Sequence, residues 1–151
     1  MKKSDLESWI KAHEGLRLTL YVDETGNPTI GWGHNLNDDT DSNELKSWIE
    51  SNNNQITIEQ AQILFNEDLE VAESALSDQD FYINQPEGVQ CALIDMCFNM
   101  GIESLLKFTN MIEALKAKNY TQAALEAMNS KWATQVGSRA QDVALVIRLG
   151  Q

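Results

Sequence analysis

The stretch that decides the fold lies near the N-terminus and combines acidic residues, glycines and a hydroxyl at close spacing. It reads His13-Glu14-Gly15-Leu16-Arg17-Leu18-Thr19-Leu20-Tyr21-Val22-Asp23-Glu24-Thr25-Gly26-Asn27-Pro28-Thr29-Ile30-Gly31-Trp32-Gly33-His34. A short helix is predicted over residues 4–13, because Ser4 and Glu7 have the spacing of a capping box. Gly15 is predicted to end that helix, since glycine adopts the left-handed conformation at little cost.

A β-hairpin is predicted next, because residues 18–22 and 29–33 alternate in polarity on either side of a turn. Simple alternation places Ile30, Trp32 and His34 on one apolar face. The opposite face is expected to carry four positions: Asp23, Thr29, Gly31 and Gly33. The missing side chains of the two glycines would let a bulky ligand such as a sugar ring lie against the backbone.

Glu14 and Asp23 are expected to have unlike environments. Glu14 falls in the last turn of its helix, where unsatisfied carbonyl groups and burial both favour a raised pKa. A carboxyl group that stays protonated near neutrality can serve as a general acid. Asp23, at a strand end beside a polar turn, is expected to stay ionised. Two such carboxyl groups facing a cleft are the minimal machinery of glycosidic cleavage; taken singly, each residue reads equally well as a surface helix end or a turn former.

The spacing of these residues resembles a known catalytic pattern. Eight residues separate Glu14 from Asp23, five separate Asp23 from Thr29, and Ile-Gly-Trp-Gly-His follows at 30–34. This pattern is similar to that of the phage-type lysozymes of glycoside hydrolase family 24, especially those of T-even phages. The resemblance extends through most of the chain. It implies that Glu14 is the general acid, Asp23 the second carboxylate, and Thr29 a residue that helps to place the attacking water.

The resemblance also implies a substrate and supporting residues. The expected activity is that of an endo-acting muramidase (endolysin), which cuts the β-1,4 bond between N-acetylmuramic acid and N-acetylglucosamine in peptidoglycan without a cofactor. His34 and Asp68 are expected to form a structural ion pair, whose stabilising effect fades as rising pH deprotonates His34. Trp132 is expected to pack behind the site, and Arg139 to reach Glu14 and lower its pKa. The substrate-binding residues implied besides the two glycines are Phe98, Asn99 and Asn110, although core packing explains Phe98 equally well.

The predicted fold class is α+β, lysozyme-like, in a single two-lobed catalytic domain. A small N-terminal lobe with a short antiparallel sheet is expected over about residues 15–60, and a mostly helical C-terminal lobe over 1–14 and 61–151. A long helix, predicted over residues 57–77 after a capping box at Thr57, is expected to join the two lobes.

Further helices are expected in the C-terminal lobe. One is predicted over residues 86–100, one begins near Phe108, and one covers 122–129 with Thr121 as its cap; residues 78–85 are interpreted as a connector.

Two cysteines, Cys91 and Cys97, fall on one of these predicted helices. They lie six residues apart, hence about 9 Å along the helix axis, which is too far for a disulfide. We expect two reduced thiols in the core. No histidine or third cysteine has metal-ligand spacing, so no metal is expected.

Charge and hydropathy exclude some classes of protein. The chain has 11 basic and 23 acidic residues, a net charge of −12, which argues against a nucleic-acid partner. It also predicts weak electrostatic capture by anionic cell walls and activity that tolerates, or prefers, some salt. The chain has no apolar run of membrane-spanning length and no signal-peptide core, so we expect no stable membrane insertion and cytoplasmic synthesis. If the protein is encoded by a phage, a holin is expected to release it to the wall. The protein is expected to be a monomer.

Several alternatives stay open at this level. Inversion is favoured, with Asp23 and Thr29 holding water; retention would need carboxyl groups about 5 Å apart rather than about 6.5–9.5 Å. A second class of function is a protein that binds wall or chitin fragments but no longer cleaves them. The presence of Glu14, Asp23 and Thr29 argues against it.

A calcium-binding domain is a third class of function. Its loop would use Asp39, Asp41, Asn43 and Glu50, but Glu44 stands where the calcium loop needs glycine.

Overall fold

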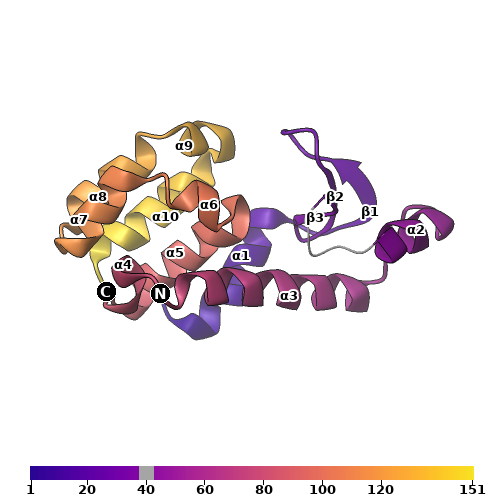
Figure 1. Cartoon of the computed structure of the whole chain (residues 1–151), viewed down its shortest axis with the longest axis horizontal. Coiled ribbons are helices and arrows are strands. Elements are labelled where there is room, and N and C mark those ends of the chain that lie inside the picture. The colour runs from indigo at the N-terminus through magenta and orange to yellow at the C-terminus, as the bar shows by residue number, and fades with distance from the viewer. Residues whose placement is uncertain (38–42) are drawn as a thin grey trace. The chain divides into compact units, whose positions relative to one another are not determined.

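The computed structural model describes residues 1–37 and 43–151 (Figure 1). The chain separates into two compact units. We call Lys11–Asp68 the sheet unit, and Met1–Ile10 together with Leu69–Gln151 the helical unit. These boundaries differ from the expected ones, which fall near residues 14 and 60. None of the helices in the described ranges is both long enough and apolar enough to cross a membrane.

The sheet unit contains a three-stranded antiparallel sheet in the order β1-β2-β3. Its strands are β1 (Arg17–Val22), β2 (Pro28–Gly31) and β3 (His34–Asn35). In the first hairpin Tyr21 lies opposite Thr29, so these two side chains are cross-strand neighbours. The fold is therefore α+β, as predicted.

The predicted second strand is too long. The strand β2 ends at Gly31, and the chain reverses so that His34 on β3 pairs with Ile30. The reversal is possible because Gly31 and Gly33 have φ angles of 70° and 73°, a region that other residues rarely adopt. The prediction that Ile30, Trp32 and His34 continue one strand and share its face is therefore wrong.

The sheet packs on its own small core. Helix α2 (Asn43–Ser51) and the start of α3 (Ile58–Leu76) complete the sheet unit. Its buried cluster consists of Ile30, Leu36, Ile49, Ile56, Ala61 and Leu64, with the flanking side chains Leu18, Leu20, Trp32 and Leu45 packed against it. The capping box at the start of α3 is confirmed: Thr57 N–H donates to Gln60 Oε1 (2.8 Å), and Gln60 N–H donates to Thr57 Oγ1 (3.2 Å).

The helical unit is built around α5 (Glu87–Met100), with Pro86 immediately before its first turn. Most of this helix is buried, which explains why its sequence is apolar on nearly every side. Helix α10 (Ser138–Leu149) packs against α5 and α8, and Figure 1 shows α10 beside both. The other helices of this unit are α4 (Asp80–Ile83), α6 (Ile102–Leu105), α7 (Thr109–Lys116), α8 (Tyr120–Met128) and α9 (Lys131–Val136).

Two predictions for this unit are wrong. Residues 78–85 are not only a connector, because they contain α4. Helix α8 is capped by Asn119, whose side chain accepts a hydrogen bond from Gln122 N–H, rather than by Thr121. Asparagine and threonine are both good N-caps, so the sequence alone did not separate the two positions.

The two cysteines are free and buried on α5, as expected for reduced core thiols. Burial raises the pKa of both, that of Cys97 to about 11. In the part of the chain that the structure describes, no group of three residues is placed to hold a metal ion. Asp39 and Asp41 of the hypothetical calcium loop lie outside the described residues.

Candidate active site

Glu14 is the last residue of helix α1 (Leu6–Glu14), which a 3₁₀ turn precedes at Lys3–Asp5. Gly15, with φ at 70°, ends the helix as predicted, and its N–H donates to Lys11 O (2.9 Å). The Glu14 side chain is half-buried and lies against Gly33. A Cβ atom at Gly33 would stand 2.9 Å from Glu14 Cδ and closer still to Oε2. The glycine therefore makes room for the carboxyl group.

The expected role of the two glycines needs a correction. A Cβ atom at Gly31 would lie 3.6 Å from Ala61 Cβ and 3.8 Å from Ile56 Cδ1, so the space beside Gly31 faces the core of the sheet unit. The space beside Gly33 is filled by Glu14. The argument that the missing side chains admit a sugar ring is wrong, because the protein itself occupies that space. Substrate binding by the backbone of these glycines stays a prediction.

Asp23 is fixed by the turn that follows β1. Its Oδ1 atom accepts three hydrogen bonds, from Thr25 N–H (2.9 Å), Thr25 Oγ1 (2.8 Å) and Asn27 N–H (2.8 Å). Burial alone raises the pKa of Asp23, but these hydrogen bonds favour the charged form more strongly and bring the pKa below its ordinary value. Asp23 is thus ionised at neutral pH, as its position in the sequence suggested. All three of these hydrogen bonds end on Oδ1 rather than on Oδ2, the second carboxylate oxygen.

Thr29 stands on β2, only 3% exposed. Its hydroxyl group donates to Asn27 O (2.9 Å), a carbonyl of the same turn that binds Asp23. A hydroxyl group has one proton and two lone pairs. Because the hydroxyl proton is already donated to Asn27 O, Thr29 Oγ1 can act toward any further partner only as a hydrogen-bond acceptor. This geometry suits a water molecule that donates to Thr29.

Tyr21 is a neighbour of the candidate site residues that the sequence analysis did not single out. Burial raises its pKa most, and the negative charges of Glu14 and Asp23 raise it further, against the opposing effect of Arg17. Both carboxylates are thus close enough to act on the same phenol. The guanidinium carbon of Arg17 lies 4.3 Å from the centre of the Tyr21 ring. The alternation of β1, which puts Tyr21 on the same side as Asp23, was the signal that could have identified it.

His34 and Asp68 form the contact that the resemblance implied. His34 Nδ1 lies 2.8 Å from Asp68 Oδ2, with the histidine buried and the aspartate half-buried. The pair ties β3 to the middle of α3. Whether it acts only as a structural support stays a prediction.

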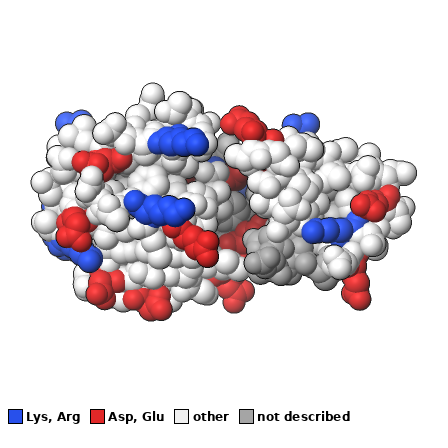
Figure 2. Space-filling view, turned by 45° about the horizontal axis from the view of Figure 1, so that its top comes forward, with Lys and Arg blue, Asp and Glu red and all other residues white. Residues whose placement is uncertain are grey.

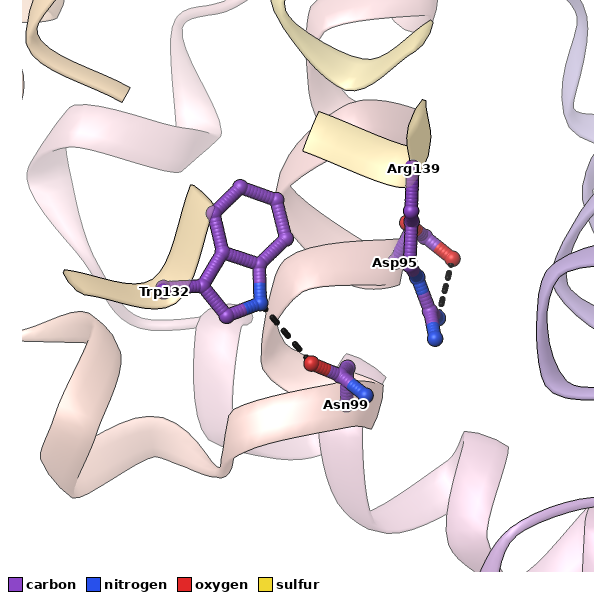
Figure 3. A network of polar contacts seen from close by, with 4 residues as sticks. All are labelled: Asp95, Asn99, Trp132 and Arg139. Atoms are coloured by element: carbon purple, nitrogen blue, oxygen red, sulfur yellow. Dashed lines mark hydrogen bonds and ion pairs between the residues drawn. The ribbon is translucent and has the colours of Figure 1, made fainter. Parts of the chain in front are cut away.

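The helical unit contains a second polar network (Figure 3). Arg139 on α10 donates from Nη2 to Asp95 Oδ1 (2.7 Å) and from Nε to Asp95 Oδ2 (3.1 Å). Both residues are buried, so the bidentate pair neutralises charge inside the unit. Sequence analysis missed Asp95, because it lies within an apolar run on α5 and its partner is 44 residues away in the chain. The expected contact of Arg139 with Glu14 stays a prediction.

Trp132 belongs to the same network. Its Nε1–H donates to Asn99 Oδ1 (2.8 Å), and its ring meets Phe108 edge to face, with centroids 6.4 Å apart. Asn110 lines a small hollow of about 230 Å³ in the helical unit, together with Phe108, Lys107 and Glu126. Phe98 is half-buried on α5. The substrate-binding roles expected for Phe98, Asn99 and Asn110 stay predictions.

The expected site residues thus divide between the two units. Those of the sheet unit are Glu14, Asp23, Thr29, Gly31, Gly33, His34 and Asp68; those of the helical unit are Phe98, Asn99, Asn110, Trp132 and Arg139. The sheet unit brings both carboxylates, the threonine and Tyr21 into one neighbourhood. Two carboxyl groups in one neighbourhood are what glycosidic cleavage requires, and their catalytic roles stay predictions.

Comparison with known proteins identifies the class. The family model described as "Phage lysozyme" matches residues 11–148. The chain is 30% identical to "Probable T4-type lysozyme 2" of Dictyostelium discoideum, over 97% of this chain and 95% of the relative. It is 35% identical to the "Endolysin" of Salmonella phage P22, over 76% of this chain and 73% of the relative. It is also 31% identical to "Pre-baseplate central spike protein Gp5" of Enterobacteria phage T4, over 93% of this chain but 27% of that protein.

The family match and the match to the Dictyostelium lysozyme span nearly the whole chain and include the segment that carries Glu14, Asp23 and Thr29. The chain belongs to the phage lysozyme family. It is accordingly a lysozyme-like, glycosidase-type hydrolase whose substrate is peptidoglycan.

Proposed function

We propose that the chain is an endo-acting muramidase, which hydrolyses the β-1,4 bond between N-acetylmuramic acid and N-acetylglucosamine. The observation that carries this proposal is the unlike treatment of two nearby carboxyl groups. The turn at 23–27 keeps Asp23 ionised by three hydrogen bonds to Oδ1. Glu14 instead stands at a helix end, in a space that Gly33 leaves for it. Only a pair of different carboxyl groups can supply an acid and a base in one step.

The reaction follows from these roles. Glu14, in its protonated form, gives its proton to the leaving glycosidic oxygen as the bond to the anomeric carbon breaks. A water molecule attacks the anomeric carbon from the opposite face. It donates one hydrogen bond to Thr29 Oγ1 and the other to Asp23 Oδ2, and Asp23 accepts the proton that the water loses. The products are two shorter glycan strands with an inverted anomeric centre.

Further residues are proposed to support this step. The backbone around Gly31 and Gly33, together with Phe98, Asn99 and Asn110, would bind the glycan. The hydrogen bond from Trp132 to Asn99 supports this role, since it would orient the amide for substrate. Arg139 would act on Glu14 while its charge is balanced by Asp95. His34 and Asp68 would hold β3 in place.

We also propose a biological setting. Similarity to a phage endolysin supports a role in host-cell lysis, with a holin releasing the protein, as a monomer, to the wall. The net charge of −12 opposes capture by an anionic wall. On the face that Figure 2 shows, basic side chains are scattered among acidic ones and form no continuous patch within the part of the chain that the structure describes. We therefore expect lysis to rise when moderate salt screens this repulsion.

The bond specificity has a direct test. Purified peptidoglycan is digested, the new reducing ends are reduced with borohydride, and the sugars are identified after acid hydrolysis. The proposal predicts that muramic acid carries the new reducing ends. Reduced glucosamine would show cleavage of the other glycosidic bond, new amino groups would show peptide cleavage, and binding without new ends would show a wall-binding protein. Each of these three results would overturn the proposal.

The stereochemical outcome is tested on the same material. Proton NMR recorded within minutes of adding a large amount of enzyme shows which anomer forms before mutarotation. The α-anomer first would support inversion, and the β-anomer first would show retention and would exclude water attack assisted by Asp23 as the first step.

A further inference from the structure

The last turn of α1 is held by a second contact, one helical turn before Glu14. Lys11 Nζ donates a hydrogen bond to Gln62 Oε1 on α3 (2.5 Å). The same ammonium lies 4.1 Å from the centre of the Trp32 ring and 5.0 Å from that of Phe65. The two rings meet edge to face, with their centroids 5.9 Å apart. We call Lys11, Trp32, Gln62 and Phe65 the lysine box.

The lysine box adjoins Glu14 both on helix α1 and on the turn between β2 and β3. Lys11 and Glu14 are three residues apart on α1, so their side chains leave the same face of the helix. Trp32 and Gly33 are consecutive in the turn between β2 and β3. The Lys11 ammonium group lies over the Trp32 ring, and the Glu14 side chain lies against Gly33. Two adjacent contacts therefore join one turn of α1 to one turn of the sheet.

Such an anchor would act at the end of a helix. The end of a helix lacks intrahelical partners for its last carbonyl groups and opens readily. Gly15 follows Glu14 directly, and glycine offers no side chain that could hold the end of the helix. Gly33, the surface on which the carboxyl group rests, also has no side chain. The side chains around this turn therefore help to set the position of Glu14, and one of them is Lys11, whose ammonium group contacts two aromatic rings and an amide oxygen.

We propose that Lys11 is a positioning residue, which holds the last turn of α1 on the Trp32–Gly33 turn and thereby fixes the carboxyl group of Glu14. This inference rests on the proposed role of Glu14 as general acid. Lys11 itself is assigned no contact with substrate. The energetic cause is the ammonium's attraction to the faces of the rings, added to a charge-assisted hydrogen bond. Loss of the box would displace Glu14 without removing it, so the chemical step would suffer more than substrate binding.

The test compares Lys11→Met with Lys11→Arg. Methionine keeps the apolar stem but loses the charge and the donor, whereas arginine keeps both. With soluble glycan strands as substrate, we expect kcat of Lys11→Met to fall by roughly tenfold or more with KM within about twofold, since small misplacements of a catalytic group are costly. Arginine should restore most of kcat. Lys116→Met is the matched control, because it removes one lysine charge from an exposed i,i+3 pair with Glu113 and should leave kcat unchanged.

Gln62→Met provides a second, milder variant if Lys11→Met does not fold. It removes the amide oxygen that the ammonium binds and should lower kcat by a few fold with KM unchanged. Circular dichroism and thermal melts are recorded for every variant. A kcat that stays at the wild-type value in folded Lys11→Met, or a loss that arginine does not restore, would overturn the inference.

The failures of the two proposals can be told apart. If Glu14→Gln stays active, the proposed general acid is wrong, whatever Lys11 does. If Glu14→Gln is inactive but folded Lys11→Met has full kcat, only the positioning role of Lys11 is wrong.

Discussion

Gly33→Ala is the substitution that most sharply tests how Glu14 is placed. The new methyl group would stand 2.9 Å from Glu14 Cδ and closer still to Oε2, so the carboxyl group must move. The residue would also keep a φ of 73°, which costs an alanine about 1–2 kcal/mol. For a chain of this size, that corresponds to a fall in Tm of roughly 2–8 °C. Displacing the acid by about 1 Å should reduce kcat by on the order of a hundredfold.

Gly101→Ala is the matched control. Gly101 also has a positive φ, 81°, but a Cβ atom there meets nothing within 4 Å. The control should lose stability and keep kcat, measured as new reducing ends per enzyme at saturating peptidoglycan. If Gly33→Ala keeps kcat within about twofold while its Tm falls as much as that of the control, the reasoning that Gly33 positions Glu14 is refuted.

Further predictions concern pH, thiol chemistry and the buried ion pair. The lowered pKa of Asp23 means that its ionised form stabilises the folded state at neutral pH, and that this contribution disappears as pH falls through the folded pKa. The Tm advantage over Asp23→Asn should therefore be constant near neutrality and shrink below about pH 4; an advantage that grows on acidification would contradict the hydrogen-bond account. Cys91 and Cys97 should resist iodoacetamide at pH 8 until the protein unfolds, because both are buried and the pKa of Cys97 is about 11; mass spectrometry showing rapid labelling of the native protein would exclude this burial. Asp95→Leu should cost about 3–5 kcal/mol in urea unfolding, because it leaves the Arg139 charge buried without its carboxylate; a loss below about 1 kcal/mol would show that Arg139 finds another partner or reaches water.

Local signals predicted much of the fold. The capping box at the start of α3 and the stop at Gly15 depend on residues within a few positions of each other, and both were found where the sequence placed them. The first hairpin was also predicted, since its turn residues lie next to each other in the chain. The resemblance carried by Glu14, Asp23, Thr29 and the run Ile-Gly-Trp-Gly-His at 30–34 indicated the family, and the family match confirms it.

What the sequence did not predict depends on contacts that are distant in the chain or on backbone conformation. The reversal between β2 and β3 was missed because the alternating pattern continues through Gly31 and Gly33, and only their positive φ angles break the strand. Asp95 was missed because its partner, Arg139, is 44 residues further along. The lysine box was missed for a similar reason, since Lys11 and Gln62 are 51 residues apart.

The hydrolysis of purified peptidoglycan by Glu14→Gln tests the central claim most directly. The variant keeps the shape of the side chain but cannot donate a carboxylic proton, and Glu24→Gln in the exposed turn serves as its control. The account predicts that folded Glu14→Gln, with the wild-type melting profile, produces new reducing ends at least about a thousandfold more slowly, while Glu24→Gln keeps the wild-type rate. Hydrolysis by Glu14→Gln at a rate close to that of the wild type would contradict the assignment of Glu14 as the general acid.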